Sequence, residues 1–233
     1  MIHVQILRLI EGARQATGLT VIIDVFRAIS LECYLYDNGA ALIRPTGTIE
    51  EAFALAKALP GSLLAGERAG KMCEGFDFGN SPSAVSPDLV AGKTVIHTTS
   101  AGTQGMINAV HADEIITASL ANAKAVADYI LAKQPRTVSL VCMGNMGVRP
   151  AAEDELCAEY IKSLVEGNPL PDLEERIADL RYHGGEHFFN PDNQEVFPEP
   201  DFWLCTKHDI FPFLIKIEKD ELGLVSRKIY PKD

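Results

Sequence analysis

Two short segments of this chain place a carboxylate close to a guanidinium along the backbone. Arg27 follows Asp24 by three residues, and Arg68 follows Glu67 directly. Carboxylates are ligands for hard divalent cations, and arginine can form two parallel hydrogen bonds with a phosphate or a carboxylate. A structural explanation stays open for the first pair, in which Asp24 caps the following helix and Arg27 lies on the surface. The two pairs predict a site for an anion beside a metal ion.

Two turns rich in glycine and polar side chains accompany these pairs. Residues 75–82 have the sequence Gly-Phe-Asp-Phe-Gly-Asn-Ser-Pro, and residues 98–103 have the sequence Thr-Thr-Ser-Ala-Gly-Thr. Glycine lets a ligand approach the backbone, and N–H groups at the start of a helix can bind an oxyanion. An ordinary turn and an ordinary helix cap are the alternatives. The residues predicted to bind phosphate or substrate are Asn80, Ser81, Thr98, Thr99, Ser100, Gly102 and Thr103.

A third acidic segment begins the helix expected at residues 150–165. Glu153, Asp154 and Glu155 follow one another there. Acids in the first turn of a helix interact favourably with the helix dipole, and this accounts for one or two of the three. A further metal ligand among them is still expected, and Asp154 or Glu153 is the candidate.

Two other motifs resemble known catalytic patterns but fit them poorly. His183 and His187 have the H-x-x-E-H spacing of one zinc-protease class, but Gly184 and Gly185 between them disfavour the required helix. A solvated loop, or a loop at the edge of the site, is the better interpretation. The segment from Cys142 to residue 149 has a Cys-x6-Arg spacing, one residue longer than a thiolate phosphatase loop, so a buried cysteine is expected.

The elements that must position these residues alternate between short apolar strands and helices. This alternation predicts a three-layer α/β/α fold with a mostly parallel sheet, as one domain over residues 1–233 or as two α/β halves. The polar candidates follow the carboxyl ends of strands, where open parallel sheets bind ligands. Strands are predicted at 20–25, 41–44, 63–65, 94–98, 114–117 and 137–142, helices at 28–36, 49–59, 103–110, 122–132 and 150–165, and a closing hairpin at 213–217 and 224–229.

Composition narrows the classes of partner. The net charge of −11 and the lack of a Lys/Arg cluster argue against nucleic acid and against an anionic membrane surface. No apolar run approaches the length of a membrane span, and no segment resembles a signal peptide. The five cysteines are odd in number and scattered, which favours reduced thiols over disulfides. We expect a cytoplasmic protein.

Taken in order, the motifs are similar to those of the 2-phosphosulfolactate phosphatase (ComB) family. The resemblance covers about residues 21–164, and the Gly-Phe-Asp-x-Gly-Asn-Ser-Pro string is its most specific part. It implies an α/β/α fold and a Mg²⁺-dependent phosphatase acting on an acidic metabolite. The family's namesake hydrolyses 2-phospho-3-sulfolactate to sulfolactate on the route to coenzyme M. Ala101 departs from the asparagine that the family often has in the Thr-Thr-x-Asn-Gly-Thr string, so the substrate here could differ.

Residues and resemblance together predict the hydrolysis of 2-phosphosulfolactate, or of a related 2-phospho hydroxy acid, by a homodimer. Mg²⁺ is expected on Asp24, Glu67 and Asp154, and the catalytic residues are expected to be Asp24, Arg27, Glu67 and Arg68. A non-catalytic anion-binding or sensing protein on the same fold is the alternative, and Ala101 is the reason for keeping it.

Overall fold

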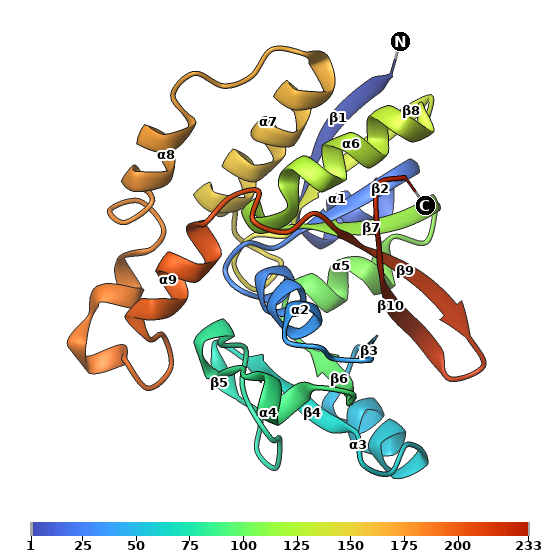
Figure 1. Cartoon of the computed structure of the whole chain (residues 1–233), viewed down its shortest axis with the longest axis vertical. Helices are drawn as coiled ribbons and strands as arrows, with labels where there is room; N and C mark the ends of the chain where they lie inside the picture. The colour runs from blue at the N-terminus through green and yellow to red at the C-terminus, as the bar shows by residue number, and fades with distance from the viewer. Residues whose placement is uncertain (1, 233) are drawn as a thin grey trace.

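The computed structural model describes residues 2–232, and a ten-stranded sheet runs through its centre (Figure 1). The strand order is β1-β8-β2-β7-β9-β10-β3-β6-β4-β5. The strands are β1 (His3–Arg8), β2 (Gly18–Ile23), β3 (Leu42–Pro45), β4 (Leu63–Arg68), β5 (Lys71–Met72), β6 (Thr94–Thr98), β7 (Ala112–Ala118), β8 (Thr137–Cys142), β9 (Leu214–Asp220) and β10 (Gly223–Ile229).

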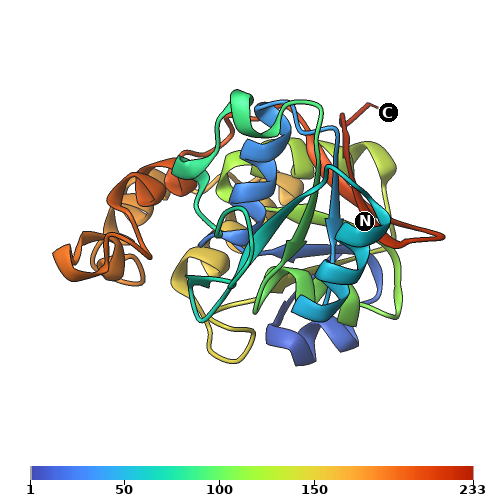
Figure 2. The same ribbon diagram turned by 90° about the horizontal axis from the view of Figure 1, so that it is seen from below.

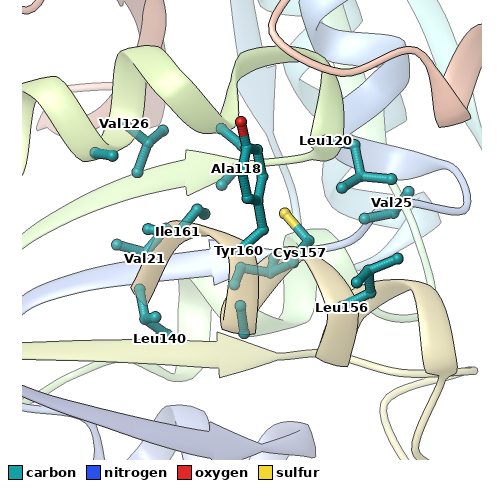
Figure 3. Packing of buried hydrophobic residues seen from close by; sticks show 14 of the residues in the cluster. Val21, Val25, Ala118, Leu120, Val126, Leu140, Leu156, Cys157, Tyr160 and Ile161 are labelled. Carbon is teal, nitrogen blue, oxygen red and sulfur yellow. The ribbon is translucent and has the colours of Figure 1, made fainter. Parts of the chain in front are cut away.

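Helices cover both faces of this sheet, as a three-layer fold requires. Alternate residues of β2 point to opposite faces: Val21 and Ile23 pack in one apolar cluster, and Ile22 packs in another. On the first face, Figure 3 shows Val21 and Leu140 beneath Tyr160 and Ile161 of a long helix. The helices are α1 (Leu9–Gln15), α2 (Ala28–Asp37), α3 (Ile49–Ala58), α4 (Pro87–Val90), α5 (Gly102–Asn108), α6 (Ala123–Lys133), α7 (Ala152–Glu166), α8 (Leu173–Asp179) and α9 (Glu199–Thr206).

The sheet consists of two parallel sets that an antiparallel hairpin joins. β1, β8, β2 and β7 pair in parallel, as do β3, β6 and β4, while β9 pairs antiparallel with β7 and β10 pairs antiparallel with β3. The successive pairings place the two sets in opposite local directions across the hairpin. The predicted α/β/α fold is therefore confirmed, and the closing hairpin lies inside the sheet.

The carboxyl ends of both sets nevertheless meet, because segments from each approach closely. A Cβ atom on Gly102, at the start of α5, would lie 2.8 Å from the Cβ atom of Ala28 and 3.0 Å from Oδ2 of Asp24. Gly66 in β4 has φ +153, and a Cβ atom there would collide with the carbonyl oxygen of Thr98. Glycine at these two positions lets the loops after β2, β4 and β6 converge.

Every predicted strand and helix has a counterpart in the structure, the closing hairpin included, and the elements that were not predicted lie mainly in residues 3–15 and 173–206. The strands Thr94–Thr98 and Thr137–Cys142 have the predicted bounds, and the other predicted elements differ by a few residues at their ends. The sequence did not predict β1 and α1, nor α8 and α9 with the 3₁₀ turns η3 (Glu186–Phe189) and η4 (Pro191–Asn193) between them. Figure 2 shows this last segment, drawn in orange, projecting to one side of the sheet. Within residues 2–232, no helix is both long enough and apolar enough to cross a bilayer.

Candidate functional site

A cavity of about 570 Å³ lies where the loops after β2, β4, β6 and β8 converge. Its wall is formed partly by carboxylates and amides and partly by cationic and aromatic side chains of the loop before α7 and of the segment between α8 and α9. Among the predicted site residues, Asp24, Arg27, Glu67, Asn80 and Ser100 line it. The volume suits a small metabolite rather than a polymer.

Asp24 follows β2 directly and combines two roles that the sequence analysis treated as alternatives. Its Oδ1 accepts a hydrogen bond of 3.1 Å from the backbone N–H of Ala28, so it caps α2, and its side chain lines the cavity. The pKa of Asp24 is raised to about 6, chiefly by burial and also by repulsion from Glu67, against the lowering effect of the Ala28 and Gly102 amides. A capping residue is thus also a destabilised carboxylate at the site.

Glu67, near the end of β4, holds two loops together at the cavity wall. Its Oε1 accepts a 2.7 Å hydrogen bond from the backbone N–H of Ser100, and its Oε2 accepts one of 2.7 Å from that of Gly70. The hydroxyl of Ser100 also donates to Oε2 at 3.3 Å. These bonds connect the turn before α5 to the hairpin between β4 and β5.

Among the acids that begin α7, Asp154 has a structural role and Glu153 faces the cavity. Asp154 is 2% exposed and accepts hydrogen bonds from the backbone N–H groups of Val25 at 2.8 Å and Gly144 at 2.7 Å, so it holds the loops after β2 and β8. Glu153 lines the cavity, and its buried Oε2 has no hydrogen-bond partner among the described residues. Burial, followed by repulsion from Asp24, raises the pKa of Glu153 to about 7.

Three carboxylates therefore face one cavity without a matching set of cations. In residues 2–232, no three His, Cys, Asp or Glu side chains already form a metal-binding cluster. The chemistry of Asp24, Glu67 and Glu153 nevertheless fits a hard divalent cation, because such an ion binds carboxylate oxygens and keeps several waters. The unpartnered Oε2 of Glu153 and the raised pKa values of Glu153 and Asp24 are the features that a bound cation would relieve.

The two predicted arginines occupy different environments. Arg27 reaches the cavity but is only 3% exposed; its Nη1 donates to Oδ2 of Asp201 at 2.7 Å, and its guanidinium lies 4.8 Å from the ring centre of Phe197. Arg68 is not part of the cavity wall; its side chain donates to the carbonyl oxygen of Glu67 at 2.6 Å and to the hydroxyl of Thr98 at 2.9 Å. Arg68 thus joins the ends of β4 and β6.

The hydroxyl turn at 98–103 is partly a cap and partly a cavity wall. Oγ1 of Thr103 accepts from the backbone N–H of Thr99 at 2.9 Å, and Oγ1 of Thr99 accepts from that of Thr103 at 3.1 Å. Ser100 and Ala101 line the cavity, and the backbone N–H of Gly102 donates to Asp24. The N–H groups of Ser100 and Gly102 therefore bind the protein's own carboxylates.

Asn80 and Ser81, in the glycine-rich turn, also differ in whether they reach the cavity. Asn80 lines the cavity, and its Oδ1 lies 3.2 Å from Nε2 of His97. The hydroxyl of Ser81 instead donates to Oδ1 of Asp201 at 2.9 Å, which ties the turn to α9. Of the two, the structure brings Asn80 to the site.

Sequence reasoning missed one cationic residue of the cavity wall, Arg149. Arg149 lines it, is exposed, and forms no side-chain hydrogen bond or ion pair with any residue in 2–232. His187 also lines it, and burial, with Arg27 second, lowers its pKa. The signal for Arg149 was its place in the loop after β8, the same kind of position that drew attention to Asp24 after β2.

The two motifs that fitted poorly have clear structural explanations. Cys142 is 1% exposed, and burial, with Asp154 second, raises its pKa, so the thiolate needed for a cysteine phosphatase is disfavoured. His183 and His187 do not share one helix, since the 3₁₀ turn η3 begins only at Glu186. Both histidines line the cavity, as expected for a loop at the edge of the site.

Comparison with known proteins gives a consistent family assignment. A family model described as 2-phosphosulpholactate phosphatase matches residues 5–187, which extends the resemblance to both histidines. A Thermotoga petrophila protein named probable 2-phosphosulfolactate phosphatase is 41% identical over 199 residues, covering 82% of this chain and 85% of that protein. A Bacillus subtilis protein of the same name is 30% identical over 214 residues, covering 91% and 92%. The chain therefore belongs to the 2-phosphosulfolactate phosphatase family, a family of phosphoric monoester hydrolases.

Proposed function

We propose that this protein hydrolyses the phosphate ester of 2-phosphosulfolactate, or of a closely related 2-phospho hydroxy acid, with the help of Mg²⁺. The observation that carries the proposal is the set of three carboxylates, Asp24, Glu67 and Glu153, on one small cavity. The same cavity contains Arg149, whose side chain has no hydrogen bond or ion pair with any described residue. The names of the relatives from Thermotoga petrophila and Bacillus subtilis supply the substrate. The homodimer and the cytoplasmic location stay predictions from the sequence.

The three cavity carboxylates would hold the metal. Glu153 takes the place that the sequence analysis gave to Asp154, because Glu153 lines the cavity and its Oε2 has no hydrogen-bond partner among the described residues, whereas Asp154 is 2% exposed and lies behind the cavity wall. A bound Mg²⁺ supplies a Lewis acid that neutralises charge on a phosphoryl group. The protein's part is to keep Asp24 and Glu67 fixed through the amides of Ala28, Gly70 and Ser100, so that little reorganisation is needed during the reaction.

Positive and amide groups across the cavity would bind the rest of the substrate. The guanidinium of Arg149 is available for a sulfonate or carboxylate, whereas that of Arg27 is already paired with Asp201. Asn80 can donate to a phosphoryl oxygen from the opposite wall. Phosphoryl transfer needs mainly positioning and charge stabilisation, and this set of residues provides both.

The first experiment measures phosphate release from 2-phosphosulfolactate with Mg²⁺, with EDTA, and with EDTA followed by excess Mg²⁺. We expect activity with Mg²⁺, its loss in EDTA, and its recovery on adding Mg²⁺. Full activity in EDTA would contradict the metal assignment. If no divalent metal gives hydrolysis while calorimetry detects tight binding of the ester, the protein is an anion-binding member of the family instead.

A matched pair of arginine variants tests the substrate assignment. Arg149→Gln should raise the KM for 2-phosphosulfolactate by about 10- to 100-fold, the cost of one hydrogen bond between charged groups. The effect should be much smaller with a phosphomonoester that lacks a second anionic group. Arg136→Gln, which changes an exposed arginine outside the cavity, should have wild-type kinetics. If Arg149→Gln raises KM equally for both substrates, Arg149 contacts the phosphate rather than the second anionic group.

A further inference from the structure

A chain of buried polar side chains leads from the cavity into the core. Asn80, in the cavity wall, contacts His97 of β6, with 3.2 Å between Oδ1 and Nε2. His97 Nδ1 lies 2.9 Å from Oε1 of Glu32 in α2, and Ser226 of β10 donates to the other oxygen of Glu32 at 3.4 Å. His97, Glu32 and Ser226 are fully buried, and Asn80 is 6% exposed. Four separate elements thus contribute to one polar chain that the sequence analysis did not foresee.

The chemistry of the partners determines the direction of each hydrogen bond. The Glu32 carboxylate can only accept, so Nδ1 of His97 donates to it. The carbonyl oxygen of Asn80 can also only accept, so Nε2 of His97 donates to it as well. The hydrogen on Nε2 therefore holds Oδ1 of Asn80 at 3.2 Å, while Nδ1 keeps the ring in place through its contact with Glu32 at 2.9 Å.

These directions fix which end of the Asn80 amide is free. With Oδ1 held by His97, the two N–H donors of Nδ2 remain, and Nδ2 has no hydrogen-bond partner among residues 2–232. Donors facing the cavity attract a phosphoryl oxygen, whereas the reversed amide would present its carbonyl oxygen to the same anion and repel it. The orientation of one amide therefore decides whether this wall of the cavity favours the substrate.

We propose that His97, held by Glu32, is a positioning residue that orients the Asn80 amide as a hydrogen-bond donor to the substrate's phosphoryl group. This inference rests on the proposed function. Core packing alone would not require His97 and Glu32 at these positions, since apolar residues of similar volume often stabilise a protein as well as a buried polar pair does. A side chain that orients a ligand-binding group resembles the outer hydrogen-bond partners of metal ligands, whose removal costs about 10- to 100-fold in affinity or activity.

Two conservative replacements of His97 separate positioning from packing. The side-chain amide nitrogen of glutamine can occupy the place of Nε2, and that of asparagine the place of Nδ1. His97→Gln therefore keeps the bond to Asn80, and His97→Asn keeps only the bond to Glu32. We expect His97→Asn to lower kcat/KM by about 10- to 100-fold and to weaken inhibition by inorganic phosphate by a similar factor. His97→Gln should retain most of the wild-type activity.

A double-mutant cycle with Asn80→Ala shows whether His97 acts through Asn80. In the Asn80→Ala background, His97→Asn should cause little further loss of kcat/KM, because the amide that His97 orients is already gone. Ser139→Ala, which removes from β8, a strand of the other parallel set, a fully buried hydroxyl hydrogen-bonded to Thr17 and Gln5, serves as the control. It should lower the melting temperature without changing kcat/KM.

The outcomes distinguish the inference from the proposed function. If the wild-type protein hydrolyses the ester but the losses of His97→Asn and Asn80→Ala multiply, or if His97→Gln and His97→Asn lose equal activity, the positioning role is wrong. If the wild-type protein shows no hydrolysis, the proposed function fails. Calorimetric binding of inorganic phosphate to the same variants then tests the orientation of Asn80 by itself.

Discussion

At the scale of single residues, the site is built from carboxylates whose charged forms are destabilised by burial. Asp24 is 4% exposed and Glu153 is 7% exposed, and burial is the largest cause of the raised pKa of each. Removing such a charge should stabilise the metal-free protein and abolish its function. This opposition between stability and activity is common at active sites.

The first prediction at this scale concerns Asp24→Asn. We expect phosphatase activity below detection, together with a higher melting temperature than that of the wild-type protein at pH 8 without metal. A carboxyl group whose pKa rises on folding from 3.8 to about 6 destabilises the folded state when it is charged, by on the order of 3 kcal/mol. The wild-type protein should therefore lose stability as the pH rises from about 4 to about 6, and Asp24→Asn should lose less.

Thermal unfolding at several pH values, with and without Mg²⁺, measures this difference. The gap between variant and wild type should close at about pH 3 and below, where Asp24 is protonated in both the folded and the unfolded chain. It should also shrink in Mg²⁺, which binds only the wild-type site well. A variant with unchanged kcat/KM would leave Asp24 with its capping role alone.

The sequence predicts a site residue well only where its position along the chain indicates its surroundings in the fold. Asp24 and Glu67 were found because each is an acid near the carboxyl end of an apolar strand, and both line the cavity. Arg68 has the same position but turns to Thr98, since a long flexible side chain can reach several neighbours. His97 was missed because one histidine inside a strand gives no sign of its partners, which lie 65 and 17 residues away.

At the scale of elements, α9 is tied to the site by one buried carboxylate. Asp201 is fully buried; it accepts from Arg27 at 2.7 Å, from the hydroxyl of Ser81 at 2.9 Å and from the backbone N–H of Ser83 at 2.9 Å. The loop after β2 and the glycine-rich turn therefore share one partner in the last third of the chain. This segment, which carried no recognisable motif, completes the wall of the cavity.

The prediction at this scale is a large effect of Asp201→Ala. The substitution leaves the buried guanidinium of Arg27 unpaired, and such a change costs about 3–5 kcal/mol. Urea unfolding should show this loss, and kcat/KM should fall because two loops of the site lose their anchor. Glu199→Ala on the same helix removes only the exposed hydrogen bond from Trp203 and should change stability by less than about 0.5 kcal/mol. Similar midpoints for the two variants would contradict the anchoring role.

The elements themselves were predictable where hydrophobic periodicity is strong. β8 and β6 are mostly apolar or β-branched, with one polar interruption each, and their bounds were predicted correctly. α8 and α9 are short, and the second begins Glu-Pro-Asp and includes few apolar residues with regular spacing. Their places depend on contacts with the rest of the molecule, such as the packing of Phe202 against Phe26, that no local pattern contains.

At the scale of the whole molecule, the hairpin of β9 and β10 makes one sheet out of two parallel sets. Ile217 of β9 lies opposite Ile115 of β7 and Ser226 of β10, and it is 7% exposed. Its side chain packs in the cluster that also contains Ile22 and Ile43, which belong to the two different sets. The sequence predicted this hairpin but not its place, because strand order depends on pairings between distant segments.

Ile217→Ala should therefore lower the stability of both sets together. The cavity left by the larger side chain costs about 2–5 kcal/mol. Unfolding followed by far-ultraviolet circular dichroism and by Trp203 fluorescence should give one coincident transition at a lower midpoint. Lys219→Ala, an exposed position on the same strand, is the control and should have a wild-type midpoint. Two separate transitions in the wild-type protein would show that the sets fold independently.

The position of this hairpin along the chain has a consequence for synthesis on the ribosome. β7 and β3 both emerge before β9 and β10, so a nascent chain carries two unjoined strand edges until β9 and β10 have been made. Each edge presents free backbone N–H and C=O groups that can pair with another nascent chain. Completion of the sheet thus waits for β9 and β10, and chaperones that shield strand edges would act on this protein before that point.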